Sequence, residues 1–128
     1  MNTDEKQALE ELYDRVIQAV FEVSNVLGSG FLEKVYERAL MRELAFRGVH
    51  AKAQVPMRVN YKGKEVGNYY ADILVERKLV IELKCVDGLC SEHLAQCLNY
   101  LRATGLSIAL LVNFQKPRVE HKRILYNF

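Results

Sequence analysis

The chain of 128 residues carries 18 basic and 16 acidic side chains, a formal net charge of +2, and half of its residues are hydrophobic. This length and composition suit one domain over residues 1–128 that buries a core without disulfides or structural metal, and they exclude a disordered chain. The near-neutral charge gives no general attraction for nucleic acid, so any such binding surface must be a local patch.

The sequence lacks the patterns of a membrane-spanning helix and of a signal peptide. No stretch approaches the roughly eighteen consecutive apolar residues of a membrane-spanning helix, and the first residues, MNTDEKQALEEL, lack the basic and apolar regions of a signal peptide. The three cysteines fit free thiols in a reducing compartment. We therefore expect a cytoplasmic protein without a membrane partner.

Two helices are predicted in the first third of the chain. The first covers residues 4–27 with Thr3 as its N-cap, and the second begins at residue 31 or 32 and ends at 47. Both carry apolar stripes at helical spacing, which predicts that they pack against a core. Glu33 lies beside the second stripe, where an exposed glutamate that complements the helix dipole and a side chain directed at a sheet are both open interpretations.

The middle of the chain predicts a β-meander. A strand over residues 54–61 alternates apolar and polar side chains, and its Pro56 favours an edge or a bulge. The turn at 62–63 leads to a return segment at 65–68, which continues into an antiparallel hairpin over residues 69–84.

One helix and two strands are predicted in the last third. The helix follows Ser91 as its N-cap and ends at about residue 104. The apolar strand 106–113 comes directly after a helix, which favours a crossover within a mixed sheet, and the polar strand 118–126 is expected at an edge. The order α, α, β, β, β, β, α, β, β predicts an α/β fold with the sheet between layers of helices.

The hairpin over residues 69–84 contains Asp72, Glu82 and Lys84 among apolar residues. Side chains alternate along a strand, so Glu82 and Lys84 share one face, and a three-residue loop at 76–78 would place Asp72 directly opposite Glu82. Two neighbouring carboxylates repel each other and suit a hard divalent cation such as Mg²⁺ or Mn²⁺. An adjacent ammonium could hold an attacking water or stabilise a charged transition state. The trio thus predicts phosphodiester hydrolysis, while an exposed cross-strand ion pair remains the structural alternative.

Three motifs in order resemble those of the PD-(D/E)XK nuclease superfamily. Asp72 is followed after nine residues by Glu82-Leu83-Lys84, with alanine where the name of the motif has proline. Upstream, residues 30–36, GFLEKVY, fit the pattern GxxExxY, which names a family of small bacterial and archaeal proteins within the superfamily. Downstream, Gln96 and Tyr100 resemble the QxxxY motif of RecB-like members. The ordered set is far more specific than an isolated D…ExK.

This resemblance implies a three-layer α/β/α core of the restriction-endonuclease type, preceded here by a long N-terminal helix. It implies a nuclease that uses Mg²⁺ or Mn²⁺, with DNA as the more expected nucleic-acid partner. So small an enzyme would need a second subunit to grip its substrate, which predicts a homodimer. The implied site comprises Asp72, Glu82 and the Leu83 carbonyl for the metal, and Lys84, Glu33 and Gln96 for catalysis.

A basic cluster near the end of the chain is a further candidate for contact with nucleic acid, together with Tyr100. Its charges could protect a sheet edge or stay solvated, or they could bind phosphates. The cluster comprises Lys116, Arg118, Lys122 and Arg123.

Two other interpretations stay open. Cys85, Cys90, His93 and Cys97 could supply four zinc ligands, but they lack a CxxC knuckle, and cysteine as a small buried hydrophobe explains them better. The second is a non-catalytic nucleic-acid-binding or regulatory module that retains the nuclease fold.

Overall fold

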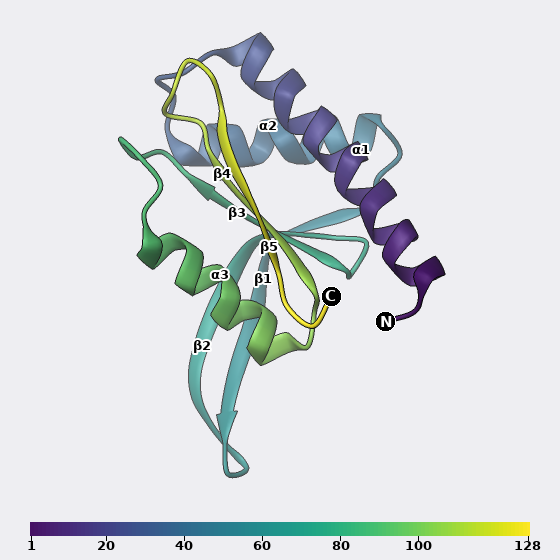
Figure 1. Ribbon diagram of the computed structural model, residues 1–128. Helices are drawn as coiled ribbons and strands as arrows, with labels where there is room; N and C mark the ends of the chain where they lie inside the picture. Colours follow the sequence, from purple (N-terminus) through teal and green to yellow (C-terminus); the bar gives the residue numbers. More distant parts are fainter.

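The computed structural model describes residues 1–128 and consists of three helices and five strands (Figure 1). They are α1 (Thr3–Leu27), α2 (Glu33–Phe46), β1 (Ala51–Tyr61), β2 (Lys64–Val75), β3 (Leu79–Lys84), α3 (Ser91–Thr104), β4 (Ile108–Asn113) and β5 (Glu120–Leu125). The strands form one sheet in the order β1-β2-β3-β4-β5. Only the β3–β4 pair is parallel, and α3 makes the crossover that such a pair needs. The predicted mixed sheet with a crossover is therefore confirmed.

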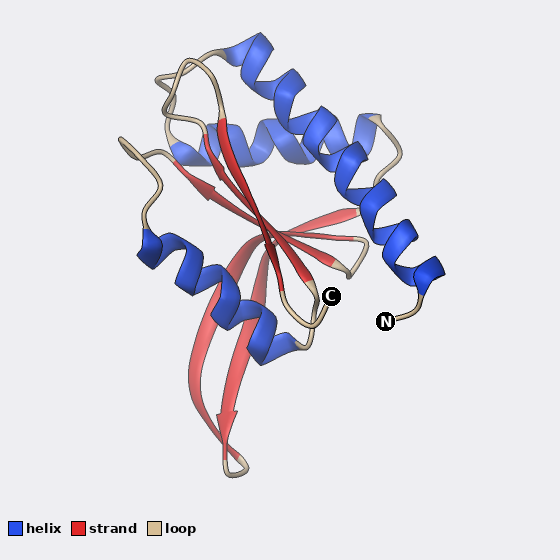
Figure 2. Ribbon diagram, in the orientation of Figure 1, coloured by secondary structure: helices blue, strands red, loops and turns tan.

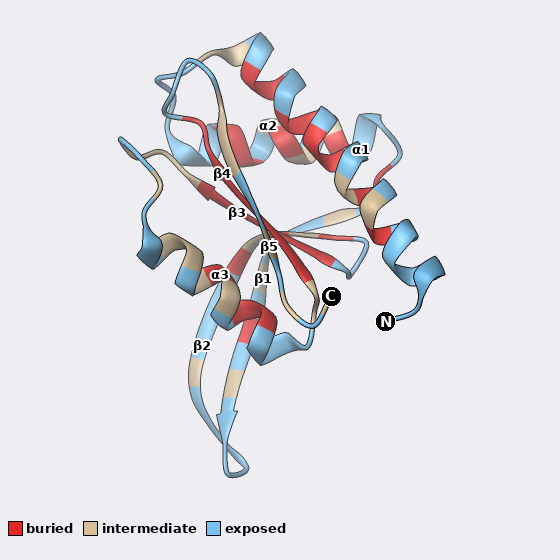
Figure 3. Ribbon diagram, viewed as in Figure 1, coloured by how far each residue is buried: buried red, intermediate tan, exposed pale blue.

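Helices cover both faces of the sheet, α1 and α2 on one side and α3 on the other (Figure 2). A core cluster of 20 buried residues joins α1 and α2 to the sheet, and a cluster of 8 buried residues joins α3 to the opposite face. Buried residues concentrate in β3, the central strand, and in its parallel neighbour β4 (Figure 3). The three-layer α/β/α core preceded by a long helix is confirmed.

The central hairpin has the register that the sequence predicts. Val75 pairs with Leu79 across the three-residue turn 76–78, and Ile73 pairs with Ile81. Glu76 and Arg77 take left-handed backbone conformations, with φ of 51° and 58°, which close this tight turn. The same register brings Asp72 opposite Glu82.

Several predicted boundaries are wrong, for local reasons. The segments predicted at 65–68 and 69–75 are one continuous strand, β2, so the chain has eight elements rather than nine. The N-cap of α1 is Asn2 rather than Thr3, because the Asn2 side chain accepts a hydrogen bond from the Glu5 N–H at 2.8 Å. The N-cap of α3 is Cys90 rather than Ser91.

The β1–β2 hairpin changes its packing partner at Gln54. Gln54 has φ 54°, in the left-handed region that residues other than glycine rarely adopt. On one side of this point Ile73 belongs to the core of α1 and α2, whereas on the other side Met57 and Ala71 belong to the core of α3. The outer half of the hairpin therefore extends beyond the first core and past α3 (Figure 1).

Candidate active site

Asp72 and Glu82 lie where the ladder between β2 and β3 ends. Beyond the last paired residues, Ile73 and Ile81, the hydrogen bonds between the two strands run from backbone N–H groups to side-chain carboxylates instead of to backbone carbonyls. An Asp72 carboxylate oxygen, Oδ2, accepts a hydrogen bond from the Leu83 N–H at 2.7 Å, and the Asp72 N–H donates to Glu82 Oε1 at 3.3 Å. The two acidic side chains that the sequence predicts to be neighbours are thus brought together.

Burial raises the pKa of both carboxyl groups, and the charge of another acid adds to each shift, that of Asp72 for Glu82 and that of Glu37 for Asp72. Glu82 is 3 % exposed, and desolvation together with the charge of Asp72 raises its pKa to about 8. The pKa of Asp72 is also raised, chiefly by burial, although the hydrogen bond from Leu83 opposes the shift. Two desolvated acids side by side are poorly suited to carry two negative charges without a cation.

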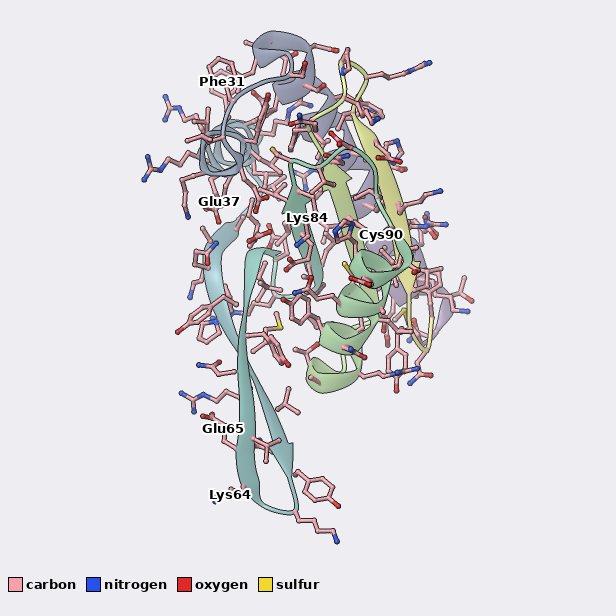
Figure 4. All side chains as sticks on the ribbon, turned by 90° about the vertical axis from the view of Figure 1, so that its left-hand side faces the viewer. Phe31, Glu37, Lys64, Glu65, Lys84 and Cys90 are labelled. Carbon is pink, nitrogen blue, oxygen red and sulfur yellow. The ribbon has the colours of Figure 1, made fainter.

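Lys84 supplies positive charge to this cluster without forming an ion pair in it. Its ammonium lowers the pKa of Glu33, Asp72 and Glu82, so it lies close enough to act on all three. Lys84 takes part in none of the four salt bridges of the chain, so a simple cross-strand ion pair is not formed. Figure 4 shows Lys84 on β3, between Glu37 of α2 and Cys90 at the start of α3.

The chain beyond Lys84 is fixed by Asn113, a fully buried residue at the end of β4. The Asn113 side chain donates to the Val86 carbonyl at 2.9 Å and accepts from the Val86 N–H at 3.1 Å. It also donates to Glu120 at 3.1 Å, and Glu120 accepts from the Leu89 N–H at 3.2 Å. These bonds hold the β3–α3 loop and so restrict where the Lys84 backbone can lie.

Glu33 lies in the first turn of α2 and contributes to the same cluster from the helix side. It is exposed, and its pKa is raised by partial burial and by the charge of Asp72. A small pocket of about 50 Å³ separates it from the strands. The pocket is lined by Glu33, Lys34, Glu37, Gln54, Asp72 and Leu83.

Two residues of this pocket, Glu37 and Gln54, were not predicted from the sequence. Glu37 is 5 % exposed and its carboxylate binds Lys34 Nζ and Gln54 Nε2, each at 2.6 Å. The same Gln54 amide nitrogen makes a longer contact of 3.4 Å to Asp72 Oδ1. The available signal was the i, i+4 spacing of Glu33 and Glu37, which places both on one face of a helix. Nothing in the residue type of Gln54 indicated its left-handed backbone.

Gln96 and Tyr100 lie on α3 at the other side of the cluster. Gln96 Nε2 donates to the Tyr100 hydroxyl at 3.0 Å. Burial and the charge of Glu82 raise the pKa of Tyr100 to about 12. The side chain of Gln96 forms no hydrogen bond to Asp72, Glu82 or Lys84, so it approaches the acidic cluster only through Tyr100.

Tyr36, the last residue of the GxxExxY segment, holds the chain that enters α2. Its hydroxyl donates to the Gly28 carbonyl at 2.6 Å and accepts from the Phe31 N–H at 3.3 Å. Its ring stacks on Phe114, with centroids 4.5 Å apart. Gly30 has φ 109°, a conformation that favours glycine. The glycine and tyrosine of this segment thus build the entry that positions Glu33.

The four basic residues of the C-terminal cluster do not form one surface. Arg123 pairs with Leu110 of the α1–α2 core and binds Glu10 of α1 at 2.6 Å, whereas its neighbour Lys122 pairs with Leu111 of the α3 core. Lys116 and Arg118 are exposed in the β4–β5 loop, and Arg118 lines a hollow beside α1. Within β5, Lys122 therefore projects from the face of the sheet that α3 covers, and Arg123 from the opposite face.

The cysteines and His93 do not assemble into a metal site. Cys85 packs against the α1–α2 core and Cys97 is buried in the α3 core, on opposite sides of the sheet. The Sγ atom of the exposed Cys90 lies 3.6 Å from His93 Nδ1, but this contact belongs to the N-terminal cap of α3. The alternative of a cysteine–histidine zinc site is therefore not supported by the geometry.

A divalent cation fits the donor atoms at Asp72 and Glu82. Nowhere in the chain do three side chains of His, Cys, Asp or Glu gather closely enough to hold a metal by themselves. Mg²⁺, however, is commonly bound through one or two carboxylates, with water and substrate phosphate completing its shell. The N–H and C=O of one strand residue point to the same edge, so the Leu83 carbonyl faces the same edge as the Leu83 N–H that binds Asp72.

Comparison with known proteins identifies the family. The sequence matches the PD-(D/E)XK nuclease superfamily over residues 10–124. This chain belongs to that superfamily. Asp72, Glu82 and Lys84, the residues of the D…ExK pattern in the sequence, lie within the matched residues. No curated protein matches the chain.

A solved structure supports the fold. The chain resembles the protein described as "Crystal structure of SSO0001", with a TM-score of 0.59 and 24 % sequence identity. The alignment covers 93 % of this chain and 60 % of that one, so this chain spans well under two thirds of the length of its structural relative.

Membership of the PD-(D/E)XK superfamily suggests a nuclease with a nucleic-acid substrate, and members generally use divalent metal ions. No helix of the chain is both long enough and apolar enough to cross a membrane.

Proposed function

We propose that this protein is a nuclease that uses Mg²⁺ or Mn²⁺ to hydrolyse phosphodiester bonds, with DNA as its substrate. The observation that carries the proposal is the pairing of Asp72 and Glu82 at the open end of the β2–β3 ladder, with the ammonium of Lys84 beside them. Structural ion pairs neutralise buried acids directly, whereas here the buried Glu82 and the half-buried Asp72 lie together and Lys84 forms no salt bridge.

Asp72, Glu82 and the Leu83 carbonyl would hold the metal. When bound, such an ion polarises a phosphoryl oxygen and lowers the pKa of a bound water. Gln54 would keep the Asp72 carboxylate in place by donating to Oδ1, and Glu37 would hold Gln54 in turn. The buried position of Glu82 keeps it from turning into solvent.

Lys84 would orient the attacking water and stabilise negative charge on the phosphoryl oxygens in the transition state. Its four-carbon stem and three donors suit this role, and its charge already acts on every acid of the cluster. Glu33 would support the metal or its water from the helix side. Gln96 would orient the substrate through its contact with Tyr100.

We further propose that the chain is a GxxExxY-type member of the superfamily and acts as a homodimer on DNA. The roles of Gly30 and Tyr36 in positioning Glu33 support the first assignment. The small size of the chain supports the second, because one copy offers little surface to grip a duplex or a strand. Sedimentation that shows only monomer at micromolar concentration would rule out the dimer.

The experiment that tests the function combines metal binding with cleavage. Wild type, Asp72→Asn and Glu82→Gln are titrated with Mn²⁺ by calorimetry, and each is incubated with single-stranded, duplex and branched DNA and with RNA, in Mg²⁺, Mn²⁺ or EDTA. We expect heat of binding and metal-dependent cleavage from the wild type and from the control Glu22→Gln, which changes an exposed acid on α1, but not from Asp72→Asn or Glu82→Gln. Equal Mn²⁺ affinity in all four proteins would remove the metal assignment.

A further inference from the structure

A second, larger pocket lies beside the acidic cluster, between α3 and the outer half of the β1–β2 hairpin. Its volume is about 660 Å³, within the range of pockets that bind small organic groups. More than half of its lining residues are hydrophobic. The residues that matter to its chemistry are Met57, Tyr69, Gln96, Asn99, Tyr100 and Arg102.

The pocket presents a fixed aromatic face. The Tyr69 side chain is half exposed, and its ring meets Tyr100 edge to face at a centroid distance of 6.0 Å. The Tyr69 ring packs over the backbone at Gly67, which has no side chain. A Cβ atom added at Gly67 would lie 3.5 Å from that ring. Tyr100 is held in turn by Gln96. A flat apolar ring that is both exposed and held in place suits stacking by another planar group.

The pocket adjoins the acidic cluster at Tyr100, which lines the pocket and lies close enough to Glu82 to be affected by its charge. Tyr100 and Ala71 belong to one buried cluster, and Ala71 is followed directly by Asp72. Tyr69 is three residues from Asp72 along β2, a separation of about 10 Å at the usual rise of a strand. A nucleotide whose phosphate lies at Asp72 and Glu82 would therefore have its neighbours within reach of Tyr69.

The charges of the pocket argue against a duplex. Duplex sites depend mainly on basic side chains that contact phosphates of both strands, whereas single-strand sites combine basic side chains with aromatic rings that stack on bases. Here the only charged lining residues are Glu92 and Arg102, whose charges cancel. The faces of bases in a duplex are already stacked and cannot reach an aromatic wall, whereas unpaired bases offer their faces freely.

We propose that this pocket binds an unpaired base of the strand that is cut, which makes single-stranded nucleic acid or an unpaired end the substrate class. The base stacks on Tyr69, while the amides of Gln96 and Asn99 reach its edge and Arg102 reaches a flanking phosphate. This inference rests on the proposed nuclease function for its placement of the scissile phosphate, but base binding itself can be measured without catalysis.

The test measures binding in EDTA by fluorescence anisotropy. The probes are labelled oligothymidine, the same strand paired with oligoadenine, a strand of equal length without bases, and oligouridine. The proteins are wild type, Tyr69→Ala, Tyr69→Phe and Tyr70→Ala. Tyr70 is the matched control because it is a neighbouring tyrosine of similar exposure that does not line the pocket. Thermal denaturation of each variant establishes that it is folded.

We expect Tyr69→Ala to weaken oligothymidine binding about tenfold, the effect of losing one stacked base. Tyr69→Phe and Tyr70→Ala should bind as the wild type, and the baseless strand should bind all four proteins equally weakly. Equal affinity of wild type and Tyr69→Ala for oligothymidine, no binding by the wild type, or tighter binding of the duplex would overturn the proposal. Oligouridine differs from oligothymidine in its sugar and in the absence of the 5-methyl group, and its binding should depend on Tyr69 in the same way because the face of the base is what stacks.

The outcome separates this proposal from the nuclease function. Binding that depends on Tyr69 in a protein that cuts nothing would uphold the base pocket and reject the nuclease. Metal-dependent cleavage of single strands by Tyr69→Ala at the wild-type KM would uphold the nuclease and reject the pocket.

Discussion

Asp72 and Glu82 are joined through backbone hydrogen bonds: the Asp72 N–H donates to Glu82 Oε1 at 3.3 Å, while the Asp72 carboxylate accepts from the N–H of Leu83, the residue after Glu82, at 2.7 Å. Each acid thus satisfies a backbone group where the ladder stops. This arrangement fixes two carboxylates next to each other and leaves their mutual repulsion in place. Its consequences can be measured in the metal-free protein.

The stability of the metal-free protein should fall as the pH rises from about 4.5 to about 8. The pKa of Glu82 is raised from 4.5 to about 8 in the folded chain, so the folded state retains a proton that the unfolded chain has already lost. The stabilising contribution is complete below about pH 4.5 and disappears as the pH passes about 8, on the order of a few kcal/mol in all. The pKa values of Asp72 and Glu33 are raised too and act in the same direction.

Urea denaturation in EDTA across this pH range checks the prediction. Glu82→Gln, which cannot ionise, should lose much less stability than the wild type, and Glu22→Gln should follow the wild type. An unchanged pH dependence in Glu82→Gln would show that this carboxyl group is not the origin of the effect.

Gln54→Gly should lower the rate of cleavage without lowering the stability of the fold. The substitution removes the amide that contacts both Glu37 and Asp72, so we expect kcat to fall about tenfold. Glycine accepts the backbone conformation at φ 54° without strain, which offsets the lost hydrogen bonds and leaves the free energy of unfolding within about 1 kcal/mol of the wild type.

Gln54→Ala is the control for that variant, since it loses the same amide but retains the strained conformation. It should be about 1–2 kcal/mol less stable than Gln54→Gly and equally slow. Full activity in both variants would mean that Gln54 does not position Asp72.

Tyr36→Phe should destabilise the protein by about 1 kcal/mol, because the hydroxyl bonds to Gly28 and Phe31 are lost while the stack on Phe114 is kept. Urea denaturation measures the change, with the exposed Tyr61→Phe as a control that should leave stability unaltered. Wild-type stability in Tyr36→Phe would show that this hydroxyl does not secure the entry to α2.

The central hairpin was predictable because its information is local. The alternation of side chains placed Asp72 opposite Glu82 on the condition of an odd turn length, and the observed three-residue turn meets that condition. The crossover from β3 through α3 to β4 was predictable in the same way, from an apolar strand that follows a helix.

Glu37, Gln54 and Arg123 were beyond local reasoning. A buried glutamate on an amphipathic helix cannot be told from an exposed one until its partners are known, and those of Glu37 include Gln54, 17 residues away. The left-handed backbone of Gln54 has no signature in its residue type. Arg123 forms an ion pair with Glu10, which is 113 residues away in the sequence. The basic cluster in the sequence therefore does not correspond to one basic surface.

Lys122 and Arg123 should differ in their effects on nucleic-acid binding although they are adjacent. Lys122→Ala should weaken binding and reduce the salt slope of affinity by about 1, as expected for one lost phosphate contact. Arg123→Ala should leave binding unchanged and lower stability by up to about 1 kcal/mol, because it loses Glu10 and the face of Tyr13.

Anisotropy titrations at several salt concentrations, with denaturation of both variants, measure this difference. Equal losses of affinity in the two variants would indicate that both faces of β5 contact nucleic acid.

The most direct test of the nuclease assignment compares Lys84→Ala with the wild type and with Lys78→Ala, a lysine exposed in the hairpin turn. Cleavage of single-stranded DNA is followed in Mn²⁺, and the shift in Tm on adding Mn²⁺ is recorded for each protein. We predict a fall in kcat of at least about a hundredfold in Lys84→Ala alone, with the Mn²⁺ shift in Tm retained in all three. Cleavage by Lys84→Ala at the wild-type rate would contradict the account.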